Sequence, residues 1–587
     1  MERIIEKLSS IIQDKFEELG YDREYGMVTV SNRPDMCQFQ CNGALVAAKK
    51  YKKAPILIAN SIVEALKSNE EFESVEAVMP GFINIIIEDE FLIGYLKNME
   101  SDEKFGCVTA SKPLTIVVDY GGPNVAKPLH VGHLRAAIIG ESIKRISKFL
   151  GHRVIGDVHL GDWGLQIGMV ISELKRRKPE LPYFNENFKG EYPEEAPFTV
   201  DELSEIYPAA SKFAKSDEAA MEEARKATFE FQNGREGYVA LWKHILNVSV
   251  NDLKKNYSDL NVEFDLWKGE SDSQKYIGEM VNYLEENSYT YVSEGATVID
   301  VAKEEDTYTI PPFILLKSDG ATLYGTTDLA TIWERVREYG PDEIIYVVDK
   351  RQGMHFEQLF RCAVKTKIAS DKLALNFIGF GTMNGKDGKP FKTRDGGVMR
   401  LQDLIKMIKD NVRGKLKESD TIDENEMEEI SRKVGLAALK YGDLSNQITK
   451  DYVFDLDRFS SFEGNTGPYI LYTVVRIKSI LAKSEAEIFE HEAKLLNPSS
   501  NIERSLMLKL AAFNEVIDKA FVDKAPNKIC EYIYDLANIF NKFYHDNRII
   551  SEEDIEKKMS WLRLITMTKG ILETGLELLG LEAPDKM

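Results

Sequence analysis

The chain has 587 residues, enough for several domains of roughly 100–200 residues each. Its 75 Lys and Arg residues against 96 Asp and Glu residues give a formal net charge of −21, which argues against a protein that coats nucleic acid at large but leaves room for a local basic face. Five scattered cysteines without a CxxC pair argue against a disulfide framework or a zinc ribbon, and a charged N-terminus without a long apolar run predicts a cytoplasmic protein that does not engage membranes.

The first 108 residues are typical of a small α+β domain. Apolar residues at helical spacing predict an amphipathic helix at the start and a second helical pattern over about 44–66, interrupted near Pro55. Two apolar runs within 73–89 predict paired strands. These residues alone indicate a packing domain and carry no catalytic signal.

The most informative stretch begins with an apolar, β-branched run at 114–118, which predicts a strand. A Gly-Gly-Pro-Asn cluster ends it, and a helical pattern follows over about 133–149. A strand, a glycine-rich turn and a helix N-terminus present free backbone N–H groups to an anion. His130 and His133 lie in that turn, and Gly132 leaves room for a flat ring against the backbone. Phosphate binding and a purely structural turn both remain open here, whereas a metal half-site lacks nearby residues to complete its ligands.

A second glycine-rich turn follows within 153–164, after a short predicted strand. Asp157, His159 and Asp162 surround it, and an Asp-capped tight turn explains them on sequence grounds. Residues 170–300 are mostly helical and charged, with several prolines near their start. Such a length between two halves of an α/β sheet predicts an insertion.

The next strand is predicted over 312–317, before a helix for which Thr327 or Asp328 is the natural N-cap. Asp328 therefore has two interpretations. It is either a capping carboxylate or a carboxylate that accepts two charge-assisted bonds from a planar guanidinium, a geometry that a lysine ammonium does not satisfy.

Two further strands, over 342–348 and 375–381, lead into a loop at 383–397 with four cations and four glycines. Closely spaced positive charge suits a triphosphate whose leaving group gains charge, although a solvated basic loop is the simpler interpretation in isolation. Residues 401–431 predict charged helix with a solvated face. From 434 onward the chain is predicted to be helical, with an apolar stripe between Tyr532 and Tyr544 that is typical of a core.

The segment Pro123-Asn124-Val-Ala-Lys-Pro-Leu-His130-Val-Gly-His133-Leu-Arg closely resembles the HIGH signature of class I aminoacyl-tRNA synthetases, in the form carried by arginyl-tRNA synthetases. Similar segments occur in each domain in the expected order: Pro80-Gly-Phe-Ile-Asn84, His159-Leu-Gly-Asp-Trp-Gly164, 260–265, 269–271, 454–472, 535–537 and 581–587. The chain is identified as a member of this family on that basis.

The resemblance implies a Rossmann-type parallel-sheet catalytic domain at 109–435, with the insertion at about 170–300. This domain would lie between the N-terminal α+β domain, 1–108, and an all-α helical bundle at 436–587. In the family the N-terminal domain contacts the tRNA elbow, the insertion helps to place the acceptor end and the bundle binds the anticodon. Exposed aromatic residues of the bundle could stack on anticodon bases.

The reaction implied by the resemblance has two steps. The carboxylate of L-arginine attacks the α-phosphorus of ATP to give arginyl-adenylate and pyrophosphate, and a terminal ribose hydroxyl of tRNA-Arg then takes the arginyl group. In this family the first step typically requires bound tRNA. The expected partners are therefore ATP with Mg²⁺, L-arginine and tRNA-Arg, with no tightly bound protein metal, and we expect a monomer.

Site residues carried over by the resemblance fall into two groups. His130, Gly132, His133, His355 and Lys392 would bind ATP; Asp119, Asn124, Glu270, Tyr324, Asp328 and Gln352 would bind arginine. Catalysis would rest on His130 and His133 together with three lysines: Lys127, Lys389 and Lys392. The 383–397 loop lacks Lys-Met-Ser-Lys-Ser, so the lysine that neutralises the pyrophosphate is open between Lys392 and Lys127.

Three alternatives remain on sequence grounds. A class I synthetase for cysteine or glutamine is opposed by the Tyr324 and Asp328 pair, and cysteine also by missing zinc ligands. A small-molecule nucleotidyltransferase with a HIGH-type site would have no use for the long helical C-terminal region. A synthetase-like regulatory protein is opposed by the intact histidines and the lysine-rich loop.

Overall fold

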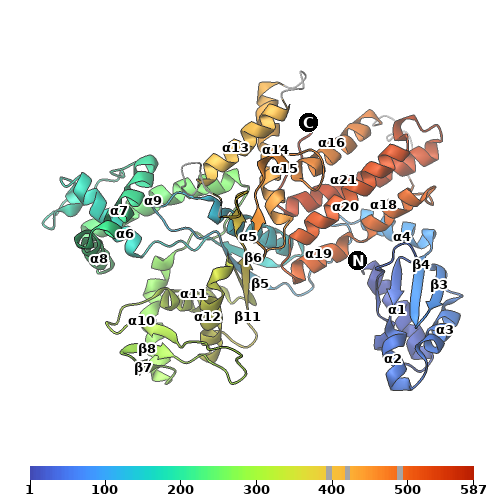
Figure 1. The fold of residues 1–587 in the computed structure, drawn as a ribbon, viewed down its shortest axis with the longest axis horizontal. Helices are drawn as coiled ribbons and strands as arrows, with labels where there is room; N and C mark the ends of the chain where they lie inside the picture. Colours follow the sequence, from blue (N-terminus) through green and yellow to red (C-terminus); the bar gives the residue numbers. More distant parts are fainter. Residues whose placement is uncertain (390, 392–398, 417–422, 485–493) are drawn as a thin grey trace.

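The computed structural model describes residues 1–587 except 390, 392–398, 417–422 and 485–493. Figure 1 shows a central α/β body, a helical lobe to one side, a small N-terminal domain and a helical C-terminal region. This arrangement confirms the predicted multidomain α/β class with an α+β domain at the N-terminus and helices at the C-terminus.

Within the described residues, the central body holds a four-stranded parallel sheet in the order β11-β10-β5-β6. Its strands are β5 (Thr115–Tyr120), β6 (Arg153–Asp157), β10 (Glu343–Asp349) and β11 (Ala374–Phe380). β5 and β10 are buried along most of their length, which explains their nearly continuous apolar sequences. In register, Val118 of β5 lies opposite Gly156 of β6 and Ile345 of β10.

Helix α5 (Val131–Phe149) connects β5 to β6, whereas β10 joins the other edge of β5. The winding of the sheet therefore reverses between β5 and β10. In open parallel sheets such a reversal leaves a crevice at the carboxyl ends of the strands.

The chain between β6 and β10 forms two units. The first is the lobe at the left of Figure 1: α6 (Leu165–Arg177), α7 (Val200–Ser216), α8 (Glu218–Gln232) and α9 (Glu236–Asp259). The second packs helices on an antiparallel sheet and ends before β10: α10 (Glu270–Glu286), β7 (Tyr291–Ser293), β8 (Ala296–Ile299), β9 (Phe313–Leu316) and α11 (Tyr324–Tyr339). The strand predicted over 312–317 is β9, but it pairs with β8 and not with the parallel sheet. Helix α12 (Gly353–Lys365) connects β10 to β11.

The N-terminal domain is a four-stranded antiparallel sheet, β1-β2-β4-β3, with helices packed on it. Its elements are α1 (Ile4–Glu18), β1 (Val28–Val30), β2 (Phe39–Cys41), α2 (Gly43–Tyr51), α3 (Pro55–Leu66), β3 (Phe72–Val78), β4 (Phe82–Ile87) and α4 (Asp89–Glu100). The predicted first helix, the break at Pro55 and the strand pair are confirmed. β1 and β2 were not predicted.

The C-terminal half is helical, as predicted: α13 (Leu401–Leu416), α14 (Glu424–Leu444), α15 (Leu456–Phe459), α16 (Gly467–Lys483), α18 (Asn501–Ala511), α19 (Phe513–Val522), α20 (Asn527–Asp546) and α21 (Ile555–Leu578). A short parallel pair, β12 (Met383–Asn384) and β13 (Tyr452–Val453), joins it to the end of the sheet. Helix α14 runs without interruption through the predicted boundary at 435. The charged helix predicted from 401 buries an apolar face from Leu401 to Leu416, so α13 is amphipathic rather than simply solvated. The aromatic stripe on α20 is buried from Tyr532 to Phe543, as expected of a core.

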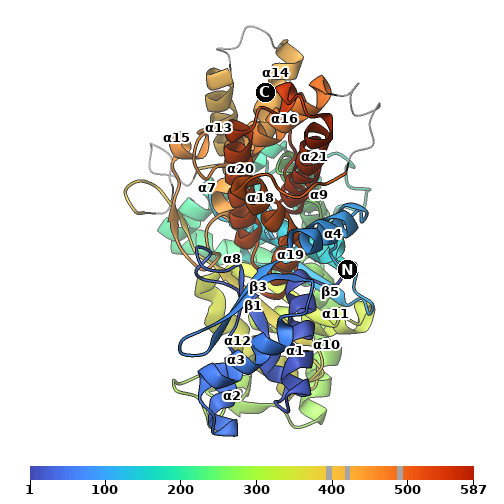
Figure 2. The ribbon, with the colours of Figure 1, turned by 90° about the vertical axis from the view of Figure 1, so that its right-hand side faces the viewer.

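The N-terminal domain rests on the C-terminal helices, and Figure 2 shows α4 beside α18 and α19. Arg504 of α18 donates to Asp89 at 2.6 Å, and Asn514 of α19 donates to the Tyr95 hydroxyl at 3.0 Å. The two ends of the sequence are therefore joined by buried and charged contacts.

Candidate active site

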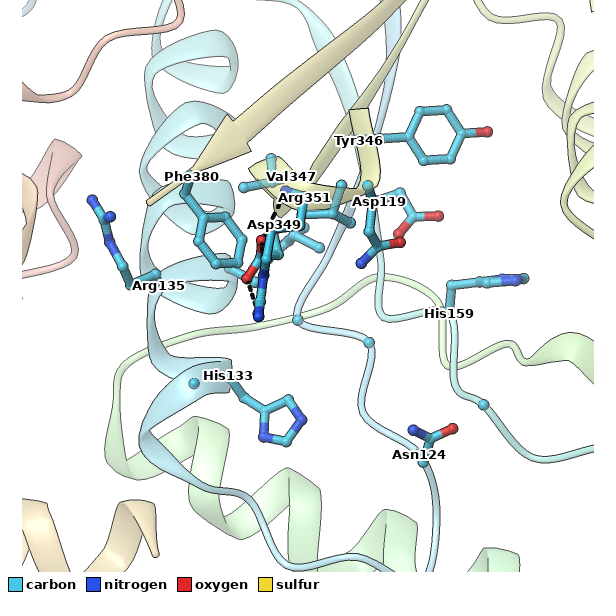
Figure 3. Close-up of a pocket in the computed structure, with 18 of the residues that line it drawn as sticks. Asp119, Asn124, His133, Arg135, His159, Tyr346, Val347, Asp349, Arg351 and Phe380 are labelled. Carbon is cyan, nitrogen blue, oxygen red and sulfur yellow. Dashed lines mark hydrogen bonds and ion pairs between the residues drawn. The ribbon is translucent and has the colours of Figure 1, made fainter. Parts of the chain in front are cut away.

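A cavity of about 750 Å³ lies at the carboxyl ends of the parallel strands, where the winding of the sheet reverses (Figure 3). The ends of β5, β10 and β11 and the first turn of α5 line it, together with the starts of α10, α11 and α12. Most of the predicted site residues meet there: Asp119, Asn124, His130, Gly132, His133, Glu270, Tyr324, Asp328, Gln352 and His355. Segments more than 200 residues apart in sequence thus line one space.

The two signature histidines close the first turn of α5. The Nδ1 atom of His130 accepts a hydrogen bond from Gly132 N at 3.1 Å, and Nδ1 of His133 accepts one from His130 N at 3.2 Å. Because Nδ1 accepts in both rings, each neutral imidazole carries its proton on Nε2 and is a donor there. Burial lowers the pKa of His133 to about 3, and burial with the nearby Lys127 charge lowers the pKa of His130. Both rings are therefore uncharged donors at neutral pH.

The glycine between them is required by geometry. A Cβ at Gly132 would lie 2.9 Å from the His130 ring, so the flat group against this backbone is the imidazole of His130 itself. The two rings lie with their centroids 3.9 Å apart and their planes inclined at 30°.

The second glycine-rich turn pairs with the first. Val125 N donates to Gly161 O at 3.0 Å, and Gly161 N donates to Pro123 O at 3.1 Å. A Cβ at Gly161 would lie 2.3 Å from Oδ1 of Asn124, so the glycine makes room for that side chain. The pairing fixes Asn124 at the edge of the cavity.

Glu270, the first residue of α10, is fixed from the same turn. Its N–H donates to Leu160 O at 2.9 Å, and Asp162 accepts from both N and Oγ of Ser271, at 2.9 and 2.6 Å. Burial raises the pKa of Glu270 to about 7, and the negative charges of Asp162 and Asp328 act in the same direction. A cation entering this end of the cavity would lower that pKa and favour the carboxylate.

Asp328 does not cap its helix. α11 begins at Tyr324 with Leu323 as N-cap, and the Thr326 hydroxyl accepts from Leu323 N at 3.0 Å. The prediction of an N-cap at Thr327 or Asp328 is therefore wrong. The N-cap is Leu323, because its N–H donates to the Thr326 hydroxyl and the first helical turn closes there. Asp328 lies a full turn inside the helix and bonds Nε2 of His355 at 2.6 Å. This bond holds the Asp328 carboxylate at the cavity wall. It connects a residue that was predicted to bind arginine with His355, which was predicted to bind ATP.

A buried guanidinium connects two strand ends beneath the cavity. Arg335 of α11 is 2% exposed, and its Nη2 donates to Asp119 and Asp157, each at 2.6 Å. Burial raises the pKa of Asp119, whereas the Arg335 charge holds the pKa of Asp157 below its usual range. Asp119, Asp157 and His159 are spaced closely enough for a metal ion, but Arg335 already supplies the cation between the carboxylates, so the set does not fit one.

Sequence reasoning missed Arg335, which lies in the middle of a helix without a local signal. It named His159 in a turn without assigning it a role. His159 lines the cavity with a left-handed backbone, φ 41°, and among the described residues its two buried ring nitrogens have no hydrogen-bond partner. Strained backbone and unsatisfied polar atoms concentrate where a ligand binds.

The predicted lysines stand apart from the other site residues. In the described part of the chain, Lys127 and Lys389 do not line the cavity, and Lys392 falls outside the described residues. Nζ of Lys127 lies over the ring of Tyr207 in α7, 4.7 Å from its centroid. Lys386 of the same loop pairs with Asp455 at 3.1 Å.

Models of known protein families match each of the three parts of the chain. The model of the catalytic domain of class I tRNA synthetases (R) matches residues 96–456. The arginyl tRNA synthetase N terminal domain matches residues 2–87, and the DALR anticodon binding domain matches residues 470–587. The chain belongs to the arginyl-tRNA synthetases.

Individual relatives of this synthetase agree over the full length. The arginine–tRNA ligase of Alkaliphilus oremlandii is 68% identical and that of Agathobacter rectalis is 58% identical, each with 100% of both chains covered. The solved arginyl-tRNA synthetase of Plasmodium falciparum has a TM-score of 0.83 at 27% identity, again covering 100% of both chains. The synthetase is therefore a class I ligase whose substrates are arginine, ATP and tRNA, which confirms the predicted family and reaction. In the described part of the chain, none of the helices combines the length and apolar character needed to cross a bilayer.

Proposed function

We propose that the cavity binds arginine at its Glu270 and Asp328 end and ATP at its His130 and His133 end. The observation that carries this assignment is the grouping of charge in the cavity: the half-buried carboxylates of Glu270 and Asp328 lie close enough to interact, and the neutral imidazole donors of His130 and His133 lie together in the first turn of α5. The arginine carboxylate then attacks the α-phosphorus, the bond to the bridging oxygen breaks and pyrophosphate leaves. Positioning and charge stabilisation carry the step, with little acid–base chemistry from side chains.

At the nucleotide end, His130 and His133 donate Nε2–H to phosphate oxygens as negative charge develops. Because the pKa of His133 is about 3, its ring stays neutral throughout the physiological range, and the hydrogen bond that Nδ1 accepts keeps the single ring proton on Nε2. Gly132 lets the chain approach the nucleotide closely. His355 completes this side while its Nε2 holds Asp328.

Lys127, Lys389 and Lys392 are the cations proposed for the β- and γ-phosphates. Mg²⁺ enters in this proposal as the counter-ion of the ATP substrate, because the carboxylates spaced for a metal are occupied by Arg335.

At the arginine end, Asp328 and Glu270 accept the guanidinium and Tyr324 stands beside them. Asn124 and Gln352 orient the amino acid through their amides. Asp119 commits one oxygen to Arg335 and is proposed to direct the other toward the substrate ammonium.

The tRNA is proposed to span all parts of the molecule: the elbow on residues 1–108, the acceptor end on the 170–300 insertion within 109–435, and the anticodon on 436–587. The aromatic stripe on α20 is buried, which leaves Tyr472 of α16, 41% exposed and stacked against Arg476, as the candidate platform for a base.

We also propose that the enzyme is a cytoplasmic monomer. All five cysteines lie within the described residues as buried free thiols, which suits a reducing compartment. Light scattering of the purified enzyme tests the monomer, and a stable dimer at micromolar concentration would contradict it.

The test of the arginine pocket is ATP–pyrophosphate exchange with tRNA-Arg present, with L-arginine compared against the other amino acids and against L-citrulline, its uncharged isostere. Asp328→Asn should weaken arginine recognition by about 2–5 kcal/mol, because it removes the charge that pairs with a buried guanidinium. Its preference for arginine over citrulline should narrow in parallel. Asp319→Asn, at an exposed carboxylate in the turn that precedes α11, is the matched control. Wild-type kinetics for Asp328→Asn would remove this residue from the pocket, and exchange with a different amino acid would overturn the whole assignment.

A further inference from the structure

Lys127 is held by the insertion. Its ammonium lies over the Tyr207 ring of α7, where the negative face of the ring attracts a cation. Tyr207 is half-buried and packs against the domain core. The cation proposed for the leaving phosphates is therefore bound to an aromatic side chain outside the cavity lining.

The turn that carries Lys127 is also anchored from the insertion. Ala126, the preceding residue, has a left-handed backbone with φ 64°, and its N–H donates to Ser249 of α9 at 3.0 Å. On the other side, Arg400, which forms a backbone bridge with His130, donates to Ser204 of α7 at 3.3 Å. Contacts from α7 and α9 thus fix the position of this strained turn and, with it, the backbone of Lys127.

Tyr207 lies at the rim of the cavity. Its ring contacts the ammonium of Lys127, which belongs to the turn between Asn124 and His130, and both of those residues line the cavity. Pro208 follows Tyr207 inside α7 and removes one helical hydrogen bond there, so this turn of the helix is held less tightly. The acceptor end of the tRNA must cross the rim to reach an adenylate inside.

We propose that Tyr207 is a positioning residue for Lys127: it holds the ammonium over its ring while the triphosphate site is empty and yields it to the leaving phosphates during activation. The inference rests on the proposed role of Lys127 in pyrophosphate departure. The flexible four-carbon stem of lysine lets Nζ change partner without movement of the turn. When the acceptor end of the tRNA displaces Tyr207 at the rim of the cavity, Lys127 is freed. The insertion thereby controls when this cation is available to ATP.

The arrangement has a measurable consequence for ATP. If ATP uses Lys127 only when the lysine has left Tyr207, the apparent affinity for ATP equals the intrinsic affinity multiplied by the fraction of molecules in which Lys127 is free. Removing the ring should then tighten ATP binding, whereas loss of a purely structural residue would weaken it or leave it unchanged.

The experiment measures the dissociation constant of a non-hydrolysable ATP analogue on the tRNA-free enzyme, and the KM for ATP and kcat of arginine-dependent exchange with tRNA-Arg. Tyr207→Leu should lower the dissociation constant and the KM by roughly three- to tenfold, the range expected for loss of a partly exposed cation–π contact, without lowering kcat. Tyr207→Phe, which keeps the ring, should stay within about twofold of wild type. In a Lys127→Met background, Tyr207→Leu should have no further effect.

The matched control is Phe213→Leu on the same helix. The guanidinium of Arg176 lies over the Phe213 ring, 4.1 Å from its centroid, and this pair does not line the cavity. Unchanged or weaker ATP binding in Tyr207→Leu, or an equal change in the Lys127→Met background, would overturn the proposal. Failure of the assigned reaction would show instead as absence of exchange in the wild type, while the binding measurement would still decide the role of Tyr207.

Discussion

The two ends of helix α5 differ in how completely their polar groups are paired. From the middle of the helix toward its C-terminal end the polar groups are paired: Glu141 is 2% exposed and accepts from three side chains, the Tyr120 hydroxyl at 2.8 Å, Lys144 at 2.9 Å and Arg145 at 2.7 Å. Ser142 donates to Leu578 O at 2.9 Å and ties the same turn to the end of α21. At the N-terminal end, His130 and His133 face the cavity with their Nε2–H groups available.

Other buried polar atoms near the open end are also unpaired among the described residues: Nδ1 and Nε2 of His159, Nη2 of Arg135, Nη1 of Arg335 and the Tyr346 hydroxyl. Each such group costs about 1–3 kcal/mol when no ligand satisfies it. The paired end therefore holds α5 rigid against the C-terminal domain, whereas the open end keeps donors ready for substrate at the expense of stability.

The cation that supports the open end is the guanidinium of Arg335. Arg335→Met should lower the free energy of unfolding by about 3–5 kcal/mol, because it leaves Asp119 and Asp157 buried without a counter-charge. The shift of the urea midpoint of the catalytic domain measures it.

Arg337→Met is the control for that variant. Arg337 lies on the same helix but is exposed, and its pair with Glu279 at 2.9 Å should contribute at most about 1 kcal/mol. Equal midpoints for the two variants would show that the carboxylates beneath the cavity do not depend on Arg335.

The second prediction concerns catalysis at the open end. His133→Ala should lower the rate of arginine-dependent exchange about 100-fold or more, since it removes a donor that meets charge developing on the phosphates. The KM for arginine should be largely kept, because His133 belongs to the nucleotide side. A rate near that of the wild type would exclude His133 from the reaction.

A third prediction concerns a buried cation that packs near the paired end. Lys440 of α14 is fully buried, and its ammonium donates to Leu260 O at 2.8 Å and Gly580 O at 2.9 Å. Burial lowers its pKa from 10.5 to about 7, and the charge of Glu141 opposes that shift while Arg145 adds to it. Its third N–H group donates to Asn261 O at 3.5 Å, so, unlike the groups around the cavity, this cation has no spare donor for a ligand.

The sign of the pH dependence follows from that lowered pKa. Below pH 7 both states carry the proton, and the folded state bears the full cost of the buried charge. Between the folded pKa of about 7 and the unfolded value of 10.5, the unfolded chain binds the extra proton, so stability rises with pH by about 1.4 kcal/mol per unit. Relative to Lys440→Met, the wild type should therefore gain about 2–3 kcal/mol between about pH 7 and pH 9 in urea unfolding. A difference that does not change with pH would mean that Lys440 titrates normally.

Much of this architecture is readable from the sequence, for identifiable reasons. β5 and β10 are buried parallel strands, so their apolar runs are continuous and strand-like. The signature histidines were found because their turn is contiguous, with the strand, the glycines and the helix start within about thirty residues. β1 and β2 span three residues each, too few for a periodic pattern.

The features that could not be predicted from the sequence depend on contacts between residues that are far apart in the chain or on the geometry of one hydrogen bond. Arg335 is one of several charges on α11, and its partners lie 216 and 178 residues away. The start of that helix depends on whether the Thr326 hydroxyl closes the first turn, which propensity does not decide. The contact between Lys127 and Tyr207 joins segments 80 residues apart, and both are ordinary residues by composition.

An exposed ion pair on α5 shows whether burial of the charges, and not pairing alone, stabilises the paired end. Lys148 lies one turn beyond Lys144 on α5 and pairs with Asp265 at 3.4 Å, with both side chains more than 40% exposed. Lys148→Ala should change the free energy of unfolding by less than about 1 kcal/mol, because solvent screens the pair and ordering two side chains offsets the attraction. Glu141→Gln, by contrast, removes the charge shared by Lys144 and Arg145 in a buried site, so its urea midpoint should fall further than that of Lys148→Ala. If the two variants had equal midpoints, it would be the packing of α5 rather than its buried charges that fixes the rigid end.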